Sequence, residues 1–259
     1  MKRLFIFTLL LAEISSRGAP PPLPDGPLIA AEAPAFARWT VNCTYAPGKT
    51  EADLNEGYKT AMTKMAAADP ALAKLVATRP EMLVRKPRLQ QIVVVKTGKV
   101  RVEGLVYTNG QHEERWQDGT ATITRDAFTQ KFSAGLANGE KEPDFPEFGW
   151  INAGNFKDIR LFLGRKCLIF EGKIDPSQVD DPRAFASGSP VSEEATVPVT
   201  AAIDLETRMP VSLQCRDQIR KYEFATPPTA ALVIPPEFLA ALREQDDRNK
   251  ARTVHLSPP

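Results

Sequence analysis

Three cysteines and two histidines are the side chains of this 259-residue chain that most often serve as nucleophiles, bases or metal ligands. Cys43, Cys167 and Cys215 lie far apart, with no Cys-x-x-Cys pair and no zinc-finger spacing among them. His112 has no second histidine four residues further on, as a zinc-binding helix would require, and His255 lies in a polar C-terminal stretch. The spacing therefore predicts no metal site and no cofactor.

The motifs of the common catalytic sites are also missing from the sequence. It contains no Gly-x-Ser-x-Gly, no Ser-x-x-Lys and no glycine-rich phosphate loop. Acidic pairs such as Asp180-Asp181 lack the glycine and the terminal glutamate of a calcium-binding loop. Two carboxylates distant in sequence, as glycosidases use, are the one arrangement that the sequence leaves open. We expect no enzymatic activity and no catalytic residue.

The charges are balanced and interspersed along the chain. Lys and Arg total 33 against 32 Asp and Glu, so that the formal net charge is +1. Such a balance gives no overall electrostatic signature for nucleic acid or for an anionic membrane. We therefore expect no nucleic-acid partner, and no sequence feature identifies a protein partner.

The N-terminus has the pattern of a secretory signal peptide. Lys2 and Arg3 precede an apolar run over residues 4–12, which is too short to span a bilayer because a spanning helix needs about 20 apolar residues. We assign residues 1–16 to the signal, without a defined cleavage site, and the proline-rich residues 17–36 to a linker. The pattern predicts a periplasmic or secreted protein that does not span the membrane.

The first elements after the linker are expected to be a strand and two helices. Apolar residues alternate with polar ones over residues 39–45, which indicates a half-buried strand. Thr50 and Asp53 then resemble a capping box at the start of a helix with one apolar stripe. A shorter helix should begin at Asp69-Pro70 and end before Pro80.

The rest of the chain is predicted to be mainly antiparallel strands. Three glycine-centred turns within residues 89–126 indicate a four-stranded meander. A long loop at 133–157 carries four aromatic residues, which either anchor the loop on the core or bind a ligand. Hairpins follow on both sides of a polar surface insert at 175–194, and a helix begins at Pro235-Pro236.

These elements form one domain, residues 37–245, followed by a flexible polar tail at 246–259. Cys43 and Cys215 fall on apolar strand faces, and Cys167 points with Ile169, opposite Leu168 and Phe170. A strand should separate Cys167 from Cys215, beyond the reach of about 7 Å that a disulfide allows between Cα atoms. Two alternatives remain: three buried free thiols, or a disulfide that joins Cys43, most simply to Cys215.

The stretches AAIDLETRMPVSLQ, RKYEF and LVIPPEF resemble the late strands of the periplasmic outer-membrane lipoprotein carriers. The order of an early strand, a helix pair, a meander and a late hairpin group is also similar. The resemblance implies an α+β fold, in which helices pack on the concave face of a curved antiparallel sheet, a half-open barrel. It also implies a cavity between the sheet and the helices that binds acyl chains. The chain departs from the family in the TRMP turn, which lacks the family's glycine, and in the 133–157 loop.

Two functions follow. The first is an exported, non-enzymatic carrier of a hydrophobic ligand, a lipid or acyl chain, in the cell envelope. Its cavity wall would be formed by Trp39, Val41, Tyr45, Leu54, Tyr58, Met62 and Trp150. The second is an envelope structural or protein-interaction domain, in which the same residues form an ordinary core. The two differ in whether the concave face of the sheet is filled by the chain itself or left as an apolar void.

Overall fold

The computed structural model describes residues 22–45, 48, 50–85, 87–126, 129–134, 143–175, 196–216 and 218–256, with side chains placed through Arg248. The expected signal peptide at 1–16, the start of the linker and nearly all of the insert at 175–194 lie outside these residues.

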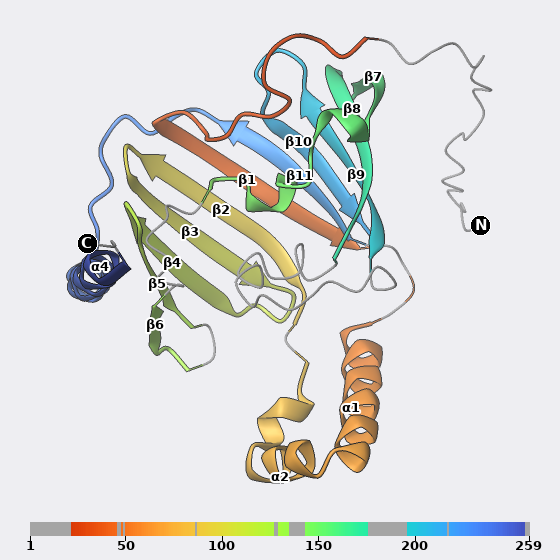
Figure 1. Ribbon diagram of the computed structural model, residues 1–259, viewed down its shortest axis with the longest axis vertical. Coiled ribbons are helices and arrows are strands. Elements are labelled where there is room, and N and C mark those ends of the chain that lie inside the picture. The colour runs from red at the N-terminus through yellow and green to blue at the C-terminus, as the bar shows by residue number, and fades with distance from the viewer. Residues whose placement is uncertain are drawn as a thin grey trace, which may run out of the picture.

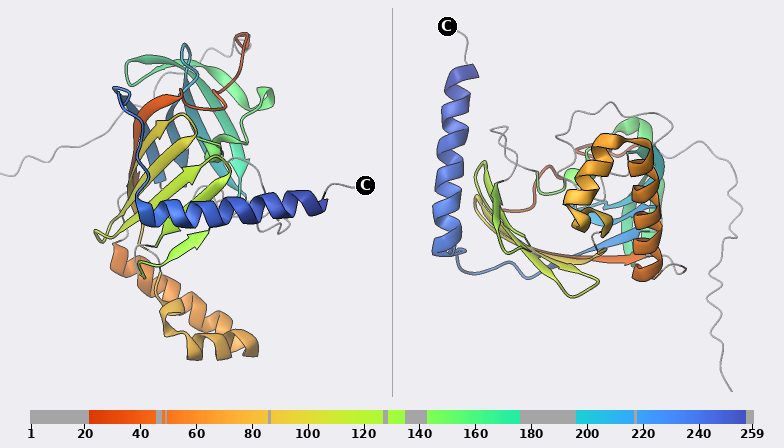
Figure 2. Two further views of the ribbon diagram at one scale, coloured as in Figure 1. Left: turned by 90° about the vertical axis from the view of Figure 1, so that its left-hand side faces the viewer. Right: turned by 90° about the horizontal axis from the view of Figure 1, so that it is seen from below.

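The described residues form one antiparallel sheet of eleven strands, in the order β6-β5-β4-β3-β2-β1-β11-β10-β9-β8-β7. Figures 1 and 2 show that it is strongly curved and open. The strands are β1 (Phe36–Tyr45), β2 (Leu89–Thr97), β3 (Val100–Tyr107), β4 (His112–Asp118), β5 (Ala121–Arg125), β6 (Phe132–Ala134), β7 (Phe156–Phe162), β8 (Arg165–Ile174), β9 (Val197–Asp204), β10 (Pro210–Cys215) and β11 (Gln218–Ala225). An α+β fold with a curved antiparallel sheet is therefore confirmed, as is the predicted meander, β2 to β5.

The two-residue period of the sequence sorts side chains between the two faces of the sheet. On β1, Trp39, Val41 and Cys43 are buried on the concave face. The polar Thr40 and Asn42 alternate with them and point the other way. The same alternation places Leu168, with its partner Ile203 on β9, on the concave face.

A β-bulge on β10 changes one expected orientation. A strict two-residue period would place Val211 on the same face as Leu213 and Cys215, but the register shifts between Pro210 and Ser212. An extra residue in one strand reverses the alternation, so Val211 packs with Cys167 on the convex face.

Helices α1 (Glu51–Ala68) and α2 (Pro70–Thr78) begin where the sequence indicates. The capping box of Thr50 and Asp53 is present, and Asp69 caps α2. Their position differs from the expected one, because they extend beyond one end of the sheet instead of packing on its concave face (Figure 1). Neither helix has a buried residue. A different segment, described below, occupies the concave face.

The last helix, α4 (Pro236–Leu256), covers the convex face at β4 and β5. Phe238 and Leu242 pack there against Trp116 and Ile123. The helix begins at the predicted proline, but it continues to Leu256, through most of the stretch that we expected to be a flexible tail. No helix among the described residues is long and apolar enough to cross a membrane.

The second half of the expected linker packs on the sheet. Ala33 is buried in the main core, and Leu28 and Ile29 lie against it. The backbone N–H of Ala30 donates to the carbonyl of Arg208 in the β9–β10 turn, at 2.9 Å. The segment before β1 therefore contributes to the core.

Candidate ligand-binding site

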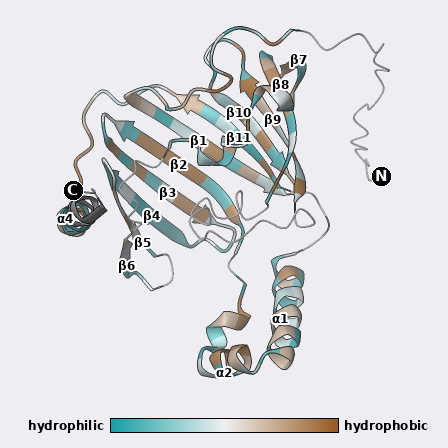
Figure 3. Ribbon diagram, in the orientation of Figure 1, coloured by the Kyte–Doolittle hydropathy of each residue, from teal (hydrophilic) through white to brown (hydrophobic). Residues whose placement is uncertain are grey.

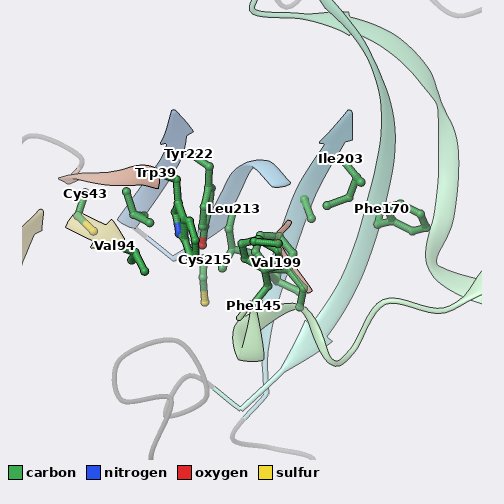
Figure 4. Packing of buried hydrophobic residues seen from close by; sticks show 14 of the residues in the cluster. Trp39, Cys43, Val94, Phe145, Phe170, Val199, Ile203, Leu213, Cys215 and Tyr222 are labelled. Atoms are coloured by element: carbon green, nitrogen blue, oxygen red, sulfur yellow. The ribbon is translucent and has the colours of Figure 1, made fainter. Parts of the chain in front are cut away.

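The concave face of the sheet has an apolar half, made by β1 and the strands from β11 to β8. Figure 4 shows its side chains converging from these strands. Its buried members are Trp39, Val41, Cys43, Tyr222, Leu213, Cys215, Val199, Ala201, Ile203, Leu168, Phe170 and Ile174. Burying this much apolar surface is a main source of stability for the fold. Something must cover it, and none of the helices that the structure describes does so.

The cover is an irregular segment that we call the strap, residues 143–155, which leads into β7. It contains two short 3-10 turns, η2 (Pro146–Phe148) and η3 (Ala153–Asn155). Phe145 lies with its ring centroid 5.6 Å from that of Trp39, and Phe148 lies edge-on to Tyr222 at 5.4 Å. Both phenylalanines are buried. The expectation that the aromatic residues of this loop anchor it to the core is confirmed for these two.

Asp144 attaches the strap to the polar half of the concave face. Its carboxylate accepts hydrogen bonds from Lys96 Nζ at 2.5 Å, Arg101 Nη1 at 2.8 Å and the N–H of Ala33 at 2.9 Å. Burial by itself raises the pKa of Asp144, but its bonds and ion pairs with Lys96 and Arg101 outweigh that effect and lower the pKa below its usual value. The strap is thus held by a buried carboxylate between two buried cations.

Glu147 attaches the strap a second time, in the apolar half. The Tyr222 hydroxyl donates a hydrogen bond to its carboxylate, and Arg220 Nη1 lies 3.8 Å from it. Burial and the negative charge of Glu147 raise the pKa of Tyr222 well above its usual value, so the phenol stays protonated and can donate. A buried glutamate on an apolar face is thereby paired with a charge and a hydrogen-bond donor.

A polar chain continues from this point to the base of α1. Arg220 Nε donates to Gln218 Oε1 at 3.1 Å, and Gln218 Nε2 donates to the Tyr45 hydroxyl at 2.8 Å. Burial, the largest influence, raises the pKa of Tyr45 to about 12. The Arg88 guanidinium lies 4.4 Å from the ring centroid of Tyr45 and bonds Glu51 on α1. Tyr45 therefore lies at the edge of the site, where the sheet meets the helices.

The ring of Trp150 packs against the backbone of β8 at Gly172. A Cβ atom added to Gly172 would lie 2.9 Å from the Trp150 ring, closer than side chains approach one another. Gly172 is therefore the residue that lets the strap reach the sheet at this point.

Replacing Gly172 with alanine should lower the free energy of unfolding by about 1–3 kcal/mol, because the added methyl group must displace Trp150. Gly104→Ala on β3 is the matched control, since a Cβ there meets nothing within 4 Å and alanine should be neutral or slightly stabilising. Urea unfolding of both variants measures the difference. Equal stabilities would show that the strap does not contact β8 as described.

The predicted cavity-wall residues fall in three places. Trp39 and Val41 lie on the concave face, and Trp150 lies on the strap that covers it. Tyr45 lies at the edge of this face, where the sheet meets the helices. Leu54, Tyr58 and Met62 are on α1, away from that face, and none of them is buried. The structure thus brings together four of the seven predicted cavity-wall residues and places the three residues of α1 away from them.

The polar residues that hold the strap were missed by the sequence analysis. They are Lys96, Arg101, Asp144, Glu147, Arg220 and Tyr222. A signal was present in the alternation of β11, because Arg220 falls on the same face as Tyr222 and must be buried with it. The acidic and aromatic run DFPEF, residues 144–148, was a second signal.

None of the three cysteines forms a disulfide and all three are buried, which matches the first of the two alternatives. Cys43 is on β1 and Cys215 on β10, with β11 between them. Two strand spacings amount to about 10 Å, beyond the Cα separation of a disulfide. As predicted, a strand (β9) also separates Cys167 from Cys215. Burial raises the pKa of the Cys43 and Cys167 thiols, which keeps them protonated.

The native protein should therefore react with a thiol reagent at least about 100-fold more slowly than the unfolded protein at any of its cysteines, because attack requires an exposed thiolate. Dithionitrobenzoate should titrate three thiols in guanidinium without reductant, and almost none in buffer over the same minutes. A titre of one thiol in guanidinium would instead reveal a disulfide.

Within the described ranges, no group of three or more His, Cys, Asp or Glu side chains could hold a metal ion.

No family model matches the chain, and no curated protein matches its sequence. Among solved structures, the crystal structure of the lipoprotein LppX of Mycobacterium tuberculosis is similar over 77% of this chain and 90% of that chain, with 10% sequence identity and a TM-score of 0.36.

Proposed function

We propose that this chain is an exported, non-enzymatic carrier or binding protein for a hydrophobic ligand, a lipid or acyl chain, in the cell envelope. One observation supports the proposal most. The apolar half of the concave face is covered by an irregular strap and not by a helix or a second sheet. The backbone hydrogen bonds of the strap lie within the strap itself, so its displacement would break mainly the side-chain contacts of Asp144, Glu147 and the two phenylalanines and would leave the sheet ladder intact.

The ligand would lie where the strap aromatics now lie. Phe145 and Phe148 contact Trp39, Phe224 and Tyr222, so an occupant of that place meets apolar and aromatic side chains. An acyl chain satisfies this surface without a hydrogen bond of its own. The carboxylates of Asp144 and Glu147 define where the strap is attached when the ligand is absent.

A second function is favoured by the same packing. Phe148 is 2% exposed and Trp39 is also 2% exposed, so this part of the concave face is filled by the chain itself. A self-filled core is what an envelope interaction or structural domain requires, and in that case the strap stays in place.

Native mass spectrometry of the protein purified from its export compartment, followed by organic extraction, separates the two functions. A stoichiometric acyl-chain adduct that is lost on extraction supports the carrier. An unliganded mass, together with no uptake of added fatty acid or lipopeptide by the extracted protein, overturns it and leaves the interaction domain.

A further inference from the structure

The helical hairpin beyond the end of the sheet is defined here as residues 51–84, comprising α1, α2 and η1 (Pro80–Leu83). Its side-chain bonds to the rest of the chain are at its base. Arg88 and the Thr108 hydroxyl bond Glu51, and the N–H of Arg85 donates to Asn55. The part further from the sheet projects along the long axis of the molecule (Figures 1 and 2).

This projecting part exposes apolar side chains. None of the residues of α1, α2 or η1 is buried. Tyr58 is 37% exposed, Met65 56%, Leu75 40% and Val84 62%. These are four of the nine large apolar residues that are exposed in the described part of the chain, so the hairpin concentrates such surface. Figure 3 shows apolar residues along both helices.

The positive charge of the hairpin is confined to its distal part, residues 58–79. Glu51, Asp53 and Glu56 lie in the first two turns of α1 and Glu81 lies on η1, so residues 51–84 as a whole carry a net charge of −1. Between Tyr58 and Arg79 there are four cations, Lys59, Lys64, Lys74 and Arg79, and one carboxylate, Asp69, which gives +3. Since the whole chain is +1, the remainder is −2, and the balanced total conceals this asymmetry. None of the four cations forms an ion pair with any residue that the structure describes.

The cations border the apolar stripe of α1. Tyr58 and Met65 are seven residues apart and therefore share one face of the helix. Lys59 follows Tyr58 and Lys64 precedes Met65, so at 100° per residue the two lysines lie on opposite sides of that face. An apolar face with lysines on both sides fits the boundary between acyl chains and anionic headgroups, because the lysine stems extend toward the phosphates.

We propose that the hairpin is a membrane-docking element that lies in the surface of an anionic phospholipid bilayer, with Tyr58, Met65 and Leu75 entering the headgroup–acyl boundary. The +3 charge of the distal residues 58–79 is complementary to such a surface, and the exposed side chains supply the apolar contact. Docking does not depend on whether the strap admits a ligand, so this inference stands apart from the proposed function.

Flotation of the full-length protein with lipid vesicles tests the docking. Vesicles of about 30% phosphatidylglycerol in phosphatidylcholine should bind the protein at least about tenfold more tightly than pure phosphatidylcholine, and the binding should weaken as salt rises. The double variant Met65→Asp, Leu75→Asp should lose this binding. Val233→Asp is the matched control, since Val233 is 85% exposed but lies between β11 and α4 and should float as the wild type does.

The charge contribution is tested separately with Lys59→Glu, Lys64→Glu. Each lost cation should weaken binding about fivefold, and each reversal should weaken it more. Lys157→Glu is the control because Lys157 is 57% exposed on β7, away from the hairpin. Circular dichroism should show that all variants keep the wild-type fold, because every altered side chain is only partly buried or exposed.

Three results would overturn the docking: no flotation with anionic vesicles, equal binding to neutral ones, or loss in the Val233→Asp control as in the hairpin variant. A dimer that becomes monomeric in Met65→Asp, Leu75→Asp would show that a second copy covers the hairpin instead. A hairpin variant that fails to float but retains an acyl adduct in native mass spectrometry would separate docking from ligand carriage.

Discussion

Replacing Asp144 with alanine should lower the free energy of unfolding by about 3 kcal/mol, because two buried cations lose their shared counter-ion. Lys96 then keeps only Glu32, at 3.3 Å, and Arg101 keeps Glu103, at 3.1 Å. The Lys96 side chain is 3% exposed and that of Arg101 5% exposed, so water cannot replace the lost carboxylate. The N–H of Ala33 also loses its acceptor. Chemical denaturation at neutral pH measures the loss.

The control for Asp144 is Glu171→Ala, which breaks an exposed ion pair with Lys157 and should change stability by no more than about 0.5 kcal/mol. The pH dependence gives a second check. The pKa of Asp144 is lowered in the folded state, so its contribution is fully present above the ordinary aspartate pKa of 3.8 and declines as the pH falls through the lower folded value. Wild type and Asp144→Ala should therefore converge in stability below about pH 4. A constant difference down to pH 2 would contradict the ion-pair account.

Replacing Phe148 with alanine should also lower the free energy of unfolding by about 3–5 kcal/mol, since the ring is 2% exposed and its removal leaves a cavity beside Tyr222. The cavity should be apolar and should bind a small apolar probe such as benzene, which would raise the melting temperature of the variant and leave that of the wild type unchanged.

Phe36→Ala is the matched control for Phe148, because Phe36 is 44% exposed and its removal leaves no enclosed space. It should lose far less stability and show no response to benzene. If Phe148→Ala were as stable as Phe36→Ala, the strap would not rest on the concave face in solution. That result would also remove the packing that favours a self-filled core.

The local elements of the fold were predictable from the sequence for local physical reasons. The capping box at Thr50, the proline that starts α2 and the glycine-centred turns of the meander each depend on residues within a few positions of one another. The two-residue alternation likewise assigned Cys167 and Leu168 to opposite faces, because the period of a strand is fixed by its backbone. The alternation fails at the bulge between Pro210 and Ser212, because one extra residue in the strand exchanges the faces to which the side chains on either side of it point.

Contacts between distant segments could not be predicted in this way. The apolar stripe of α1 predicts that the helix has a partner, but it does not say which surface that partner provides. The aromatic residues of the 133–157 loop and its DFPEF run indicate that this segment can pack on the core, but they do not say which face of the sheet it covers.

The sequence by itself determined most of the strands and the starts of the helices, because these depend on neighbours along the chain, but it missed the end of α4 at Leu256. Only the tertiary structure decided what covers the concave face. Asp144 meets the N–H of Ala33 across 111 residues and Lys96 across 48, and Glu147 meets Tyr222 across 75. No periodicity encodes such pairings, because they form only once the sheet has brought its strands together. The strap therefore fills the face that the helix stripe was expected to fill, and the hairpin is left exposed to solvent.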